Sequence, residues 1–169
     1  MKHLKILIFG LLVSLLFSGC GIYSFSGISI SPEVKTFEVR QFGNEALIVE
    51  PGLDRRFTID LQDFILNQTN LDLVTSNGDI IYEGEITRFY TAPNTATSQN
   101  TAAESRLTIA VAVRFIDTKN EENDLEKTFS FFYDYPGDQL LTGPNAETAF
   151  TEIFERITQD IVNATLAKW

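Results

Sequence analysis

Apolar and polar residues alternate along three stretches in the second half of the chain, and this period of two predicts three β-strands. The alternation is cleanest in residues 105–116, whose apolar side would contain Leu107, Ile109, Val111, Val113 and Phe115. Residues 125–135 repeat it with Leu125, Phe129, Phe131, Tyr133 and Tyr135. In residues 79–90 the expected buried side contains Ile80, Tyr82, Gly84, Ile86 and Tyr90. Each strand would have one face for a core and one polar or small-residue face.

Two other stretches carry apolar residues at spacings of three and four, which predicts helices that bury one face. Residues 53–69 contain Leu53, Phe57, Leu61, Phe64 and Ile65 at this spacing. Residues 146–168 contain Ala149, Phe150, Ile153, Phe154, Ile157, Ile161 and Leu166. We expect Asn145 to be the N-cap of this last helix.

The remaining segments predict shorter elements. Residues 34–42 read as a strand that Gly43 ends, residues 46–50 as a short extended piece and residues 71–75 as a short strand. Residues 91–103 are rich in Thr, Asn and Ala and predict a long loop.

The order strand, helix, three strands, helix favours an α+β fold. Its economical form is a two-layer sandwich, in which two helices pack on one face of a four-stranded mixed sheet. We assign residues 34–169 to this single domain.

The N-terminus has the pattern of a bacterial lipoprotein signal. Lys2 and Lys5 precede about 12 apolar residues, too few to span a bilayer. Ser18-Gly19 then precede Cys20, the only cysteine of the chain. We expect residues 1–19 to be removed as a signal peptide and the Cys20 thiol to carry lipid such as palmitate. Two or three acyl chains anchor a protein stably where one does not.

Residues 20–33 are expected to form a tether between the lipid and the domain, in which Tyr23 and Phe25 could rest at the bilayer interface. The tether begins without an aspartate at the second mature position. In many Gram-negative bacteria this absence sends a lipoprotein to the outer membrane. We therefore expect a lipid-anchored protein on the periplasmic face of the outer membrane.

Composition then excludes several functions. The chain of 169 residues has a net charge of −10, which argues against nucleic-acid binding. Cleavage before Cys20 would leave 11 Lys and Arg against 23 acidic residues, a net charge of −12, and would remove the only histidine, His3. Catalytic triads and histidine-ligated metals are therefore excluded, and we expect neither a cofactor nor a metal.

Short segments along the chain carry a resemblance. In order they are Ser18-Gly19-Cys20, Tyr23-Ser24-Phe25-Ser26-Gly27, Val34-Lys35-Thr36, Gly84-Glu85-Ile86-Thr87, Arg106-Leu107-Thr108-Ile109 and a C-terminal helix ending at Trp169. Together they resemble the LptE family of lipopolysaccharide-assembly lipoproteins, and more narrowly its Bacteroidetes-type branch.

The resemblance implies a non-enzymatic protein with two helices on a four-stranded sheet. Family members sit as a plug inside the β-barrel LptD, help it fold, and with it insert lipopolysaccharide into the outer membrane. Some members are taken to bind lipopolysaccharide through basic residues. This chain lacks a cluster of Lys and Arg, so its acidic charge disfavours direct binding of an anionic glycolipid.

Three alternatives remain open from the sequence. Arg106, Arg88 and Arg114 could contact a ligand or partner, or could pair with acids such as Glu83 or Glu85 across the sheet. Glu83 and Glu85 could also form a carboxylate pair for hydrolysis, although a strand facing solvent or a partner is favoured. Finally, the protein could be a stand-alone periplasmic module that binds a small apolar or lipid ligand between helices and sheet.

Overall fold

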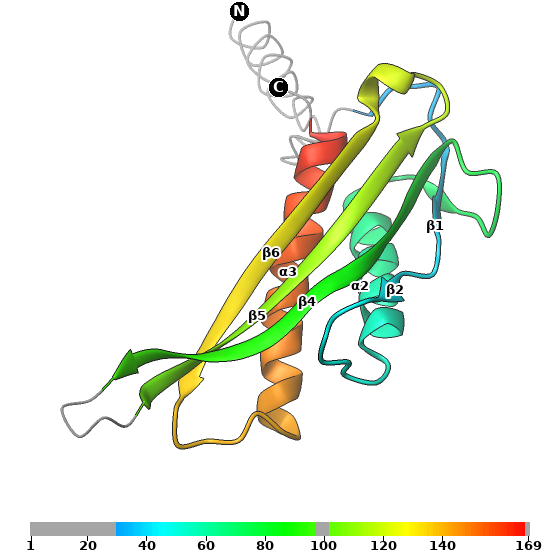
Figure 1. Ribbon diagram of the computed structural model, residues 1–169. Helices are drawn as coiled ribbons and strands as arrows, with labels where there is room; N and C mark the ends of the chain where they lie inside the picture. Colours follow the sequence, from blue (N-terminus) through cyan, green and yellow to red (C-terminus); the bar gives the residue numbers. More distant parts are fainter. Residues whose placement is uncertain (1–29, 97–101, 168–169) are drawn as a thin grey trace, which may run out of the picture.

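Six strands form one mixed sheet in the order β3-β1-β4-β5-β6, with β2 also paired to β4 (Figure 1). The structure is a computed structural model and describes residues 30–96 and 102–167. Its long strands β4 (Ile80–Ala96), β5 (Ala102–Asp117) and β6 (Leu125–Pro136) are antiparallel neighbours. A 3-10 turn, η1 (Glu121–Asn123), connects β5 to β6.

The short strands pair in parallel and raise the strand number above the four that were predicted. β1 (Thr36–Val39) lies between β3 (Asp72–Leu73) and β4, and β2 (Gly43–Asn44) adds to β4 farther along. The sequence predicted that Gly43 ends the first strand. In the structure β1 already ends at Val39, and after a short interruption Gly43 and Asn44 pair with β4 as β2. The α+β class with two helices on one face is confirmed.

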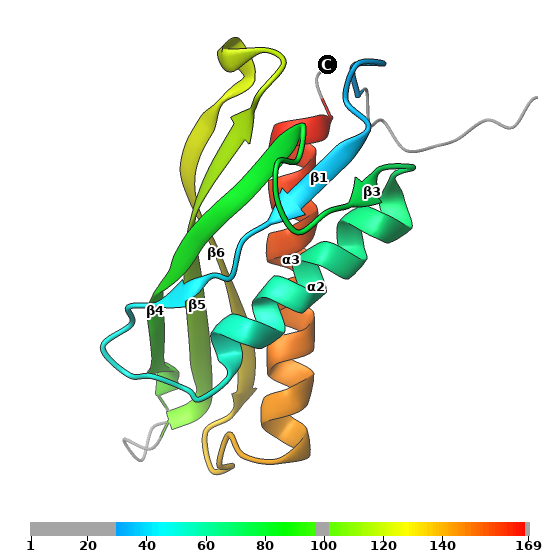
Figure 2. The same ribbon diagram turned by 90° about the vertical axis from the view of Figure 1, so that its right-hand side faces the viewer.

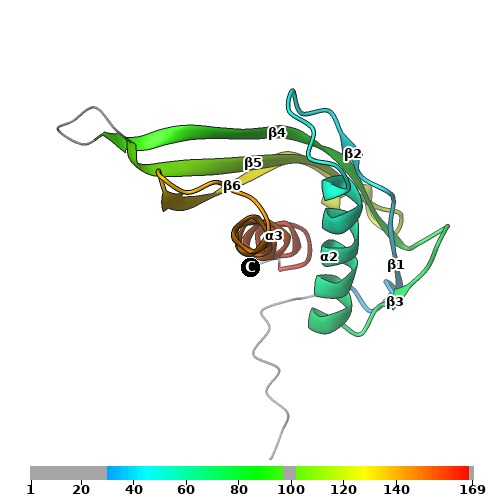
Figure 3. The same cartoon turned by 90° about the horizontal axis from the view of Figure 1, so that it is seen from below.

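Helices α2 (Leu53–Gln68) and α3 (Pro144–Leu166) cover one face of the sheet, and no helix of the described residues covers the other (Figures 2 and 3). The predicted apolar stripes of both helices face the sheet, and all stripe residues are buried except Phe64, which is partly buried. The ring of Phe57 on α2 packs edge to face against two other rings. Its centroid lies 5.0 Å from that of Phe42 and 5.1 Å from that of Phe154 on α3. The Tyr82 hydroxyl and Thr165 Oγ1 form a buried hydrogen bond of 2.9 Å between β4 and α3.

The predicted loop at residues 91–103 is largely strand. β4 continues to Ala96 and β5 begins at Ala102, so the two strands form a long hairpin that reaches beyond the helices (Figure 1). Backbone pairing such as Thr91 with Leu107 and Ala92 with Arg106 stabilises this extension. Such pairing needs no apolar side chains, and the sequence pattern therefore missed it.

A β-bulge between Ile86 and Arg88 changes which side chains of β4 face the helices, so that part of the predicted alternation is wrong. The extra residue inverts the alternation, so Phe89 turns toward the helices, where its ring lies 6.1 Å from that of Phe150. Tyr90, predicted to be buried, is 41% exposed.

The start of α3 also differs from the prediction. Gly143 is the N-cap and Pro144 takes a first-turn position, where its fixed φ and missing N–H cost nothing. Asn145 lies inside the helix, and its side-chain amide donates to Gln139 Oε1 at 3.3 Å. Similarly, residues 46–50 are a loop rather than an extended piece.

Candidate partner interface

The outer face of the sheet, opposite the helices, combines small residues with charged ones. Direct pairing across β4, β5 and β6 defines it, because paired residues of antiparallel strands point to the same side. Its members are Glu83, Glu85, Arg88 and Tyr90 on β4, Arg106, Thr108, Ala110, Ala112 and Arg114 on β5, and Glu126, Thr128, Ser130, Phe132 and Asp134 on β6. Such a face can meet solvent or a partner without a large desolvation cost.

Glu83 links two arginines at one end of the outer face. It is paired with Arg40 and, at 3.3 Å, with Arg114 on the neighbouring strand. Arg40 also contacts Glu38 at 3.0 Å, and its two carboxylate partners raise the pKa of its guanidinium. The Arg114 pair confirms the cross-strand partner expected from the sequence, and it engages the side chain of Arg114 within the protein.

Arg106 is held at the other end of this face. Its guanidinium donates to both carboxylate oxygens of Asp134, at 2.7 and 2.8 Å, and lies 3.6 Å from the ring centroid of Phe132. The hydrogen bond with Arg106 keeps the pKa of Asp134 below its ordinary value. A bidentate pair above an aromatic ring fixes the arginine on the sheet surface. The sequence suggested Glu83 or Glu85 as the partner of Arg106, whereas the structure pairs it with Asp134.

Arg88 differs from the other two. It is exposed, it lies beside the bulge opposite Ala110, and no ion pair is found for it among the described residues. The register places Arg106 and Arg114 eight residues apart on β5, with Ala110 midway. At about 3.3 Å per residue, the three arginines spread over roughly 26 Å. They therefore do not form one cationic cluster.

A groove of about 400 Å³ lies beside Arg88 at the outer edge of β4. We call it the β4 edge groove, and its lining residues are Leu47, Ile48, Thr87, Arg88, Phe89 and Tyr90. Leu47 is fully exposed and Ile48 is 58% exposed. The sequence analysis missed this feature, although four consecutive apolar residues, Ala46 to Val49, between Glu45 and Glu50 are an unusual pattern for a surface loop.

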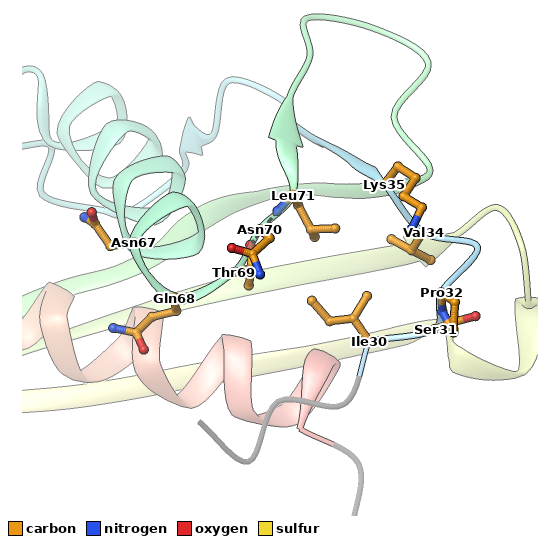
Figure 4. A pocket seen from close by; sticks show the side chains of 10 residues that line it. All are labelled: Ile30, Ser31, Pro32, Val34, Lys35, Asn67, Gln68, Thr69, Asn70 and Leu71. Carbon is orange, nitrogen blue, oxygen red and sulfur yellow. Dashed lines mark hydrogen bonds between the residues drawn. The ribbon is translucent and has the colours of Figure 1, made fainter. Parts of the chain in front are cut away.

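A second depression, of about 510 Å³, lies where the described chain begins (Figure 4). Ile30 and Val34 line one side, and Gln68, Asn70 and Leu71 at the end of α2 line the other. Among the described residues, its polar lining consists of amides, the hydroxyls of Ser31 and Thr69 and the amine of Lys35, without a carboxylate.

The carboxylates of Glu83 and Glu85 do not form a hydrolytic pair. Glu83 is engaged by two arginines, whereas a catalytic acid of a glycosidase needs a desolvated carboxyl group. Glu85 is exposed on the strand. Within residues 30–96 and 102–167, no group of acidic or sulfur ligands is arranged to hold a metal ion.

Cys20 lies outside the described residues. The same holds for Tyr23 and Phe25 of the expected tether. In the part of the chain that is described, neither helix has the length and apolar character needed to cross a membrane.

Comparison with known families shows to which family the chain belongs. The family model LptE, described as lipopolysaccharide-assembly, matches residues 34–165. The chain belongs to the LptE family. This family is non-enzymatic, so the protein has an assembly role in place of a catalytic one. No curated protein matches the chain.

Solved structures share this fold at low sequence identity. The hypothetical protein CT253 from Chlamydia trachomatis has a TM-score of 0.56 and 8% identity, covering 80% of this chain and 99% of that one. Protein XCC0632 from Xanthomonas campestris has a TM-score of 0.52 and 11% identity, covering 82% and 90%. The rare lipoprotein B from Shewanella oneidensis reaches 0.49 and 12% identity, covering 75% and 89%. For this member of the LptE family, the similarities to CT253 and XCC0632 support the α+β fold.

Proposed function

We propose that this protein is a lipid-anchored plug and assembly partner of an LptD-type β-barrel, on the periplasmic side of the outer membrane. The observation that carries the proposal is the family match over residues 34–165, which covers nearly the whole described domain. The lipoprotein signal ending at Cys20 supports the anchor. The anchor would be an acyl group such as palmitate on the new N-terminal cysteine.

The outer face supports this role through its chemistry. A plug needs a defined shape and a surface compatible with the barrel lumen, and it needs no reactive group. Small residues such as Ala110 and Ala112 lie between the neutralised pairs Glu83–Arg114 and Arg106–Asp134. Ionic groups that are already paired lose less on meeting a partner than isolated charges do.

Direct binding of lipopolysaccharide is not part of the proposal. Arg106 and Arg114 already have acidic partners, and the three arginines are spread along the sheet. The net charge of −12 expected after cleavage would repel the phosphates of the glycolipid. The barrel would therefore hold the lipopolysaccharide, with this protein shaping the lumen.

The stand-alone ligand-binding module is the less favoured alternative. Its ligand would have to lie between the helices and the sheet, where Phe57, Leu61 and Phe154 are fully buried against one another and the strands. A close-packed layer of this kind leaves little room for an acyl chain.

The test is recovery of the full-length lipidated protein from outer-membrane extract in mild detergent, followed by mass spectrometry of the proteins that accompany it. We expect one large β-barrel protein in near-stoichiometric amount. A second tagged outer-membrane lipoprotein of the same host, extracted in the same way, controls for barrels that adhere unspecifically. Recovery of this protein alone, or of the same barrels as with the control, contradicts the proposal.

A further inference from the structure

The sheet leaves the outer edge of β4 open over its second half. β2 pairs with β4 only at Glu85 and Ile86, and the last hydrogen bond on that side runs from the Glu45 amide to the Ile86 carbonyl at 2.9 Å. From Thr87 onward, β4 pairs with β5 alone among the described residues. Figure 3 shows no other element beside this part of the strand. Free N–H and C=O groups on a strand edge are a template for another strand.

The chemistry beside this open edge is specific. Leu47 and Ile48 extend from the loop after β2 and, with Phe89 and Tyr90, give the β4 edge groove an apolar lining. Natural sheets protect free edges with charges, prolines or short strands. On the open half of β4 such a residue, Pro93, lies beyond the groove, whereas an apolar loop lies next to the edge at Thr87–Tyr90. Exposed apolar surface of this kind is typical of a binding site.

Arg88 adds a charge preference. It lines the same groove, it is exposed, and it has no ion-pair partner among the described residues, while Arg106 and Arg114 on the same face are both paired. In a strongly acidic protein, a cation left unpaired between apolar groups favours a carboxylate on the molecule that binds.

We propose that the β4 edge groove binds an extended segment of the barrel partner, which adds as a strand to the open edge of β4. The segment places apolar side chains between Leu47 and Tyr90 and a carboxylate against Arg88. Backbone hydrogen bonds would supply affinity, and the groove would select the side chains. This inference rests on the proposed function, because it takes the barrel as the partner.

A polypeptide explains the groove better than an anionic lipid does. An acyl chain could fill the apolar lining and a phosphate could meet Arg88, but a lipid would leave the backbone groups of the edge unused. It would also approach a protein of like charge. Strand addition accounts for the open edge, the apolar loop and the unpaired arginine together.

The test places a photo-crosslinking amino acid in the full-length lipidated protein, in its native membrane. Groove positions are Ile48 and Tyr90, and control positions are Gln159 on α3 and Leu66 on α2, all exposed and the controls away from the outer face. We expect crosslinks to the barrel at both groove positions, in at least fivefold excess over the controls, and to one extended acidic and apolar segment. Crosslinks mainly at Gln159 or Leu66, to lipid, or to a second copy of the chain overturn the inference and leave the proposed function intact.

A charge reversal gives the second arm. Arg88→Glu should lower barrel recovery roughly tenfold, because it replaces an attraction by a repulsion at the contact. Arg55→Glu is the matched control, since Arg55 is exposed on α2 and likewise has no ion pair among the described residues. Equal recovery with both variants overturns the inference. Loss of the barrel with the unmodified protein would instead mark failure of the proposed function itself.

Discussion

At the scale of single residues, Gly84 shows how closely the sheet and the core approach. A Cβ atom at this position would lie 2.0 Å from the Ala112 carbonyl oxygen and 2.9 Å from the ring of Phe42. The first obstacle is backbone of the neighbouring strand, which cannot rotate away. The glycine therefore reflects close packing between β4, β5 and the aromatic side chain that supports them.

We expect Gly84→Ala to lower the free energy of unfolding by about 1–3 kcal/mol, since the added methyl group forces a backbone shift. Gly43→Ala is the matched control, because its Cβ would meet only Glu85 Cβ at an ordinary 3.5 Å. Chemical denaturation of both variants measures the difference. If the two glycines tolerate alanine equally well, the close approach at Gly84 is wrong.

Asp79 fastens the start of β1 to the turn before β4. Its carboxylate accepts hydrogen bonds from the amides of Lys35 and Thr36, at 2.9 and 3.0 Å, and pairs with Lys119 Nζ at 2.8 Å. The Lys119 contact, followed by the Lys35 amide, lowers the pKa of Asp79 strongly. The folded state thus keeps this carboxylate ionised at a pH where the unfolded chain is protonated.

Stability should therefore depend on pH through Asp79. A lowered pKa contributes stability that is complete above the unfolded value of about 3.9 and is lost as the pH falls below it. We expect Asp79→Asn to cost about 2 kcal/mol at pH 7, from the lost charged hydrogen bonds, and the cost to shrink below pH 4. Thermal melts between pH 7 and 3 measure this. Asp138→Asn, in an exposed loop, should leave the curve unchanged, and a cost at Asp79 that stays constant with pH would contradict the assignment.

At the scale of elements, periodicity along the chain predicted which segments are helices and strands. Leu107 to Phe115 alternate on β5, and the structure buries all five apolar members of that set. The stripes of α2 and α3 likewise face the sheet. These predictions succeed because the spacing of apolar residues within an amphipathic element determines which of its faces is buried.

Features that depend on pairing with a distant segment were not predictable in this way. The bulge at Ile86 and Arg88 exchanges Tyr90 for Phe89 on the buried side, and the sequence contains no glycine there to indicate it. The hairpin through Thr91 and Ala92 is stabilised by backbone pairing.

The same distinction applies to the candidate interface, where some contacts follow from the alternation within single strands and others depend on how the strands pair. The Glu83–Arg114 pair could be anticipated, because both residues lie on the polar faces of predicted strands. The partner of Arg106 could not, since the choice of Asp134 depends on the register of β6. The open edge of β4 was also beyond the sequence, because it exists only where the short strand β2 stops.

At the scale of the whole molecule, the chain enters and leaves the domain at one end. The start of the described chain before β1 and the C-terminal turn of α3 lie there, and the β4–β5 hairpin extends at the opposite end (Figures 1 and 2). Ile30 follows Cys20 by ten positions, a reach of about 35 Å for an extended chain. This is comparable with the hydrocarbon thickness of about 30 Å. A domain anchored through Cys20 could therefore enter a barrel lumen while its lipid stays in the inner leaflet.

The anchor makes a prediction that concerns the molecule as a whole. The expected charge of −12 repels anionic lipid surfaces, so retention should depend on the acyl chains and on the barrel. We expect Cys20→Ala to keep the thermal melt of the domain. In cells without the barrel partner, this variant should move from the membrane pellet to the fraction released on osmotic shock. The unmodified protein in the same cells should stay in the pellet, because its lipid suffices. If the alanine variant sediments with the membrane in the absence of the barrel, another surface of the protein binds the bilayer and the anchor at Cys20 is not what holds it.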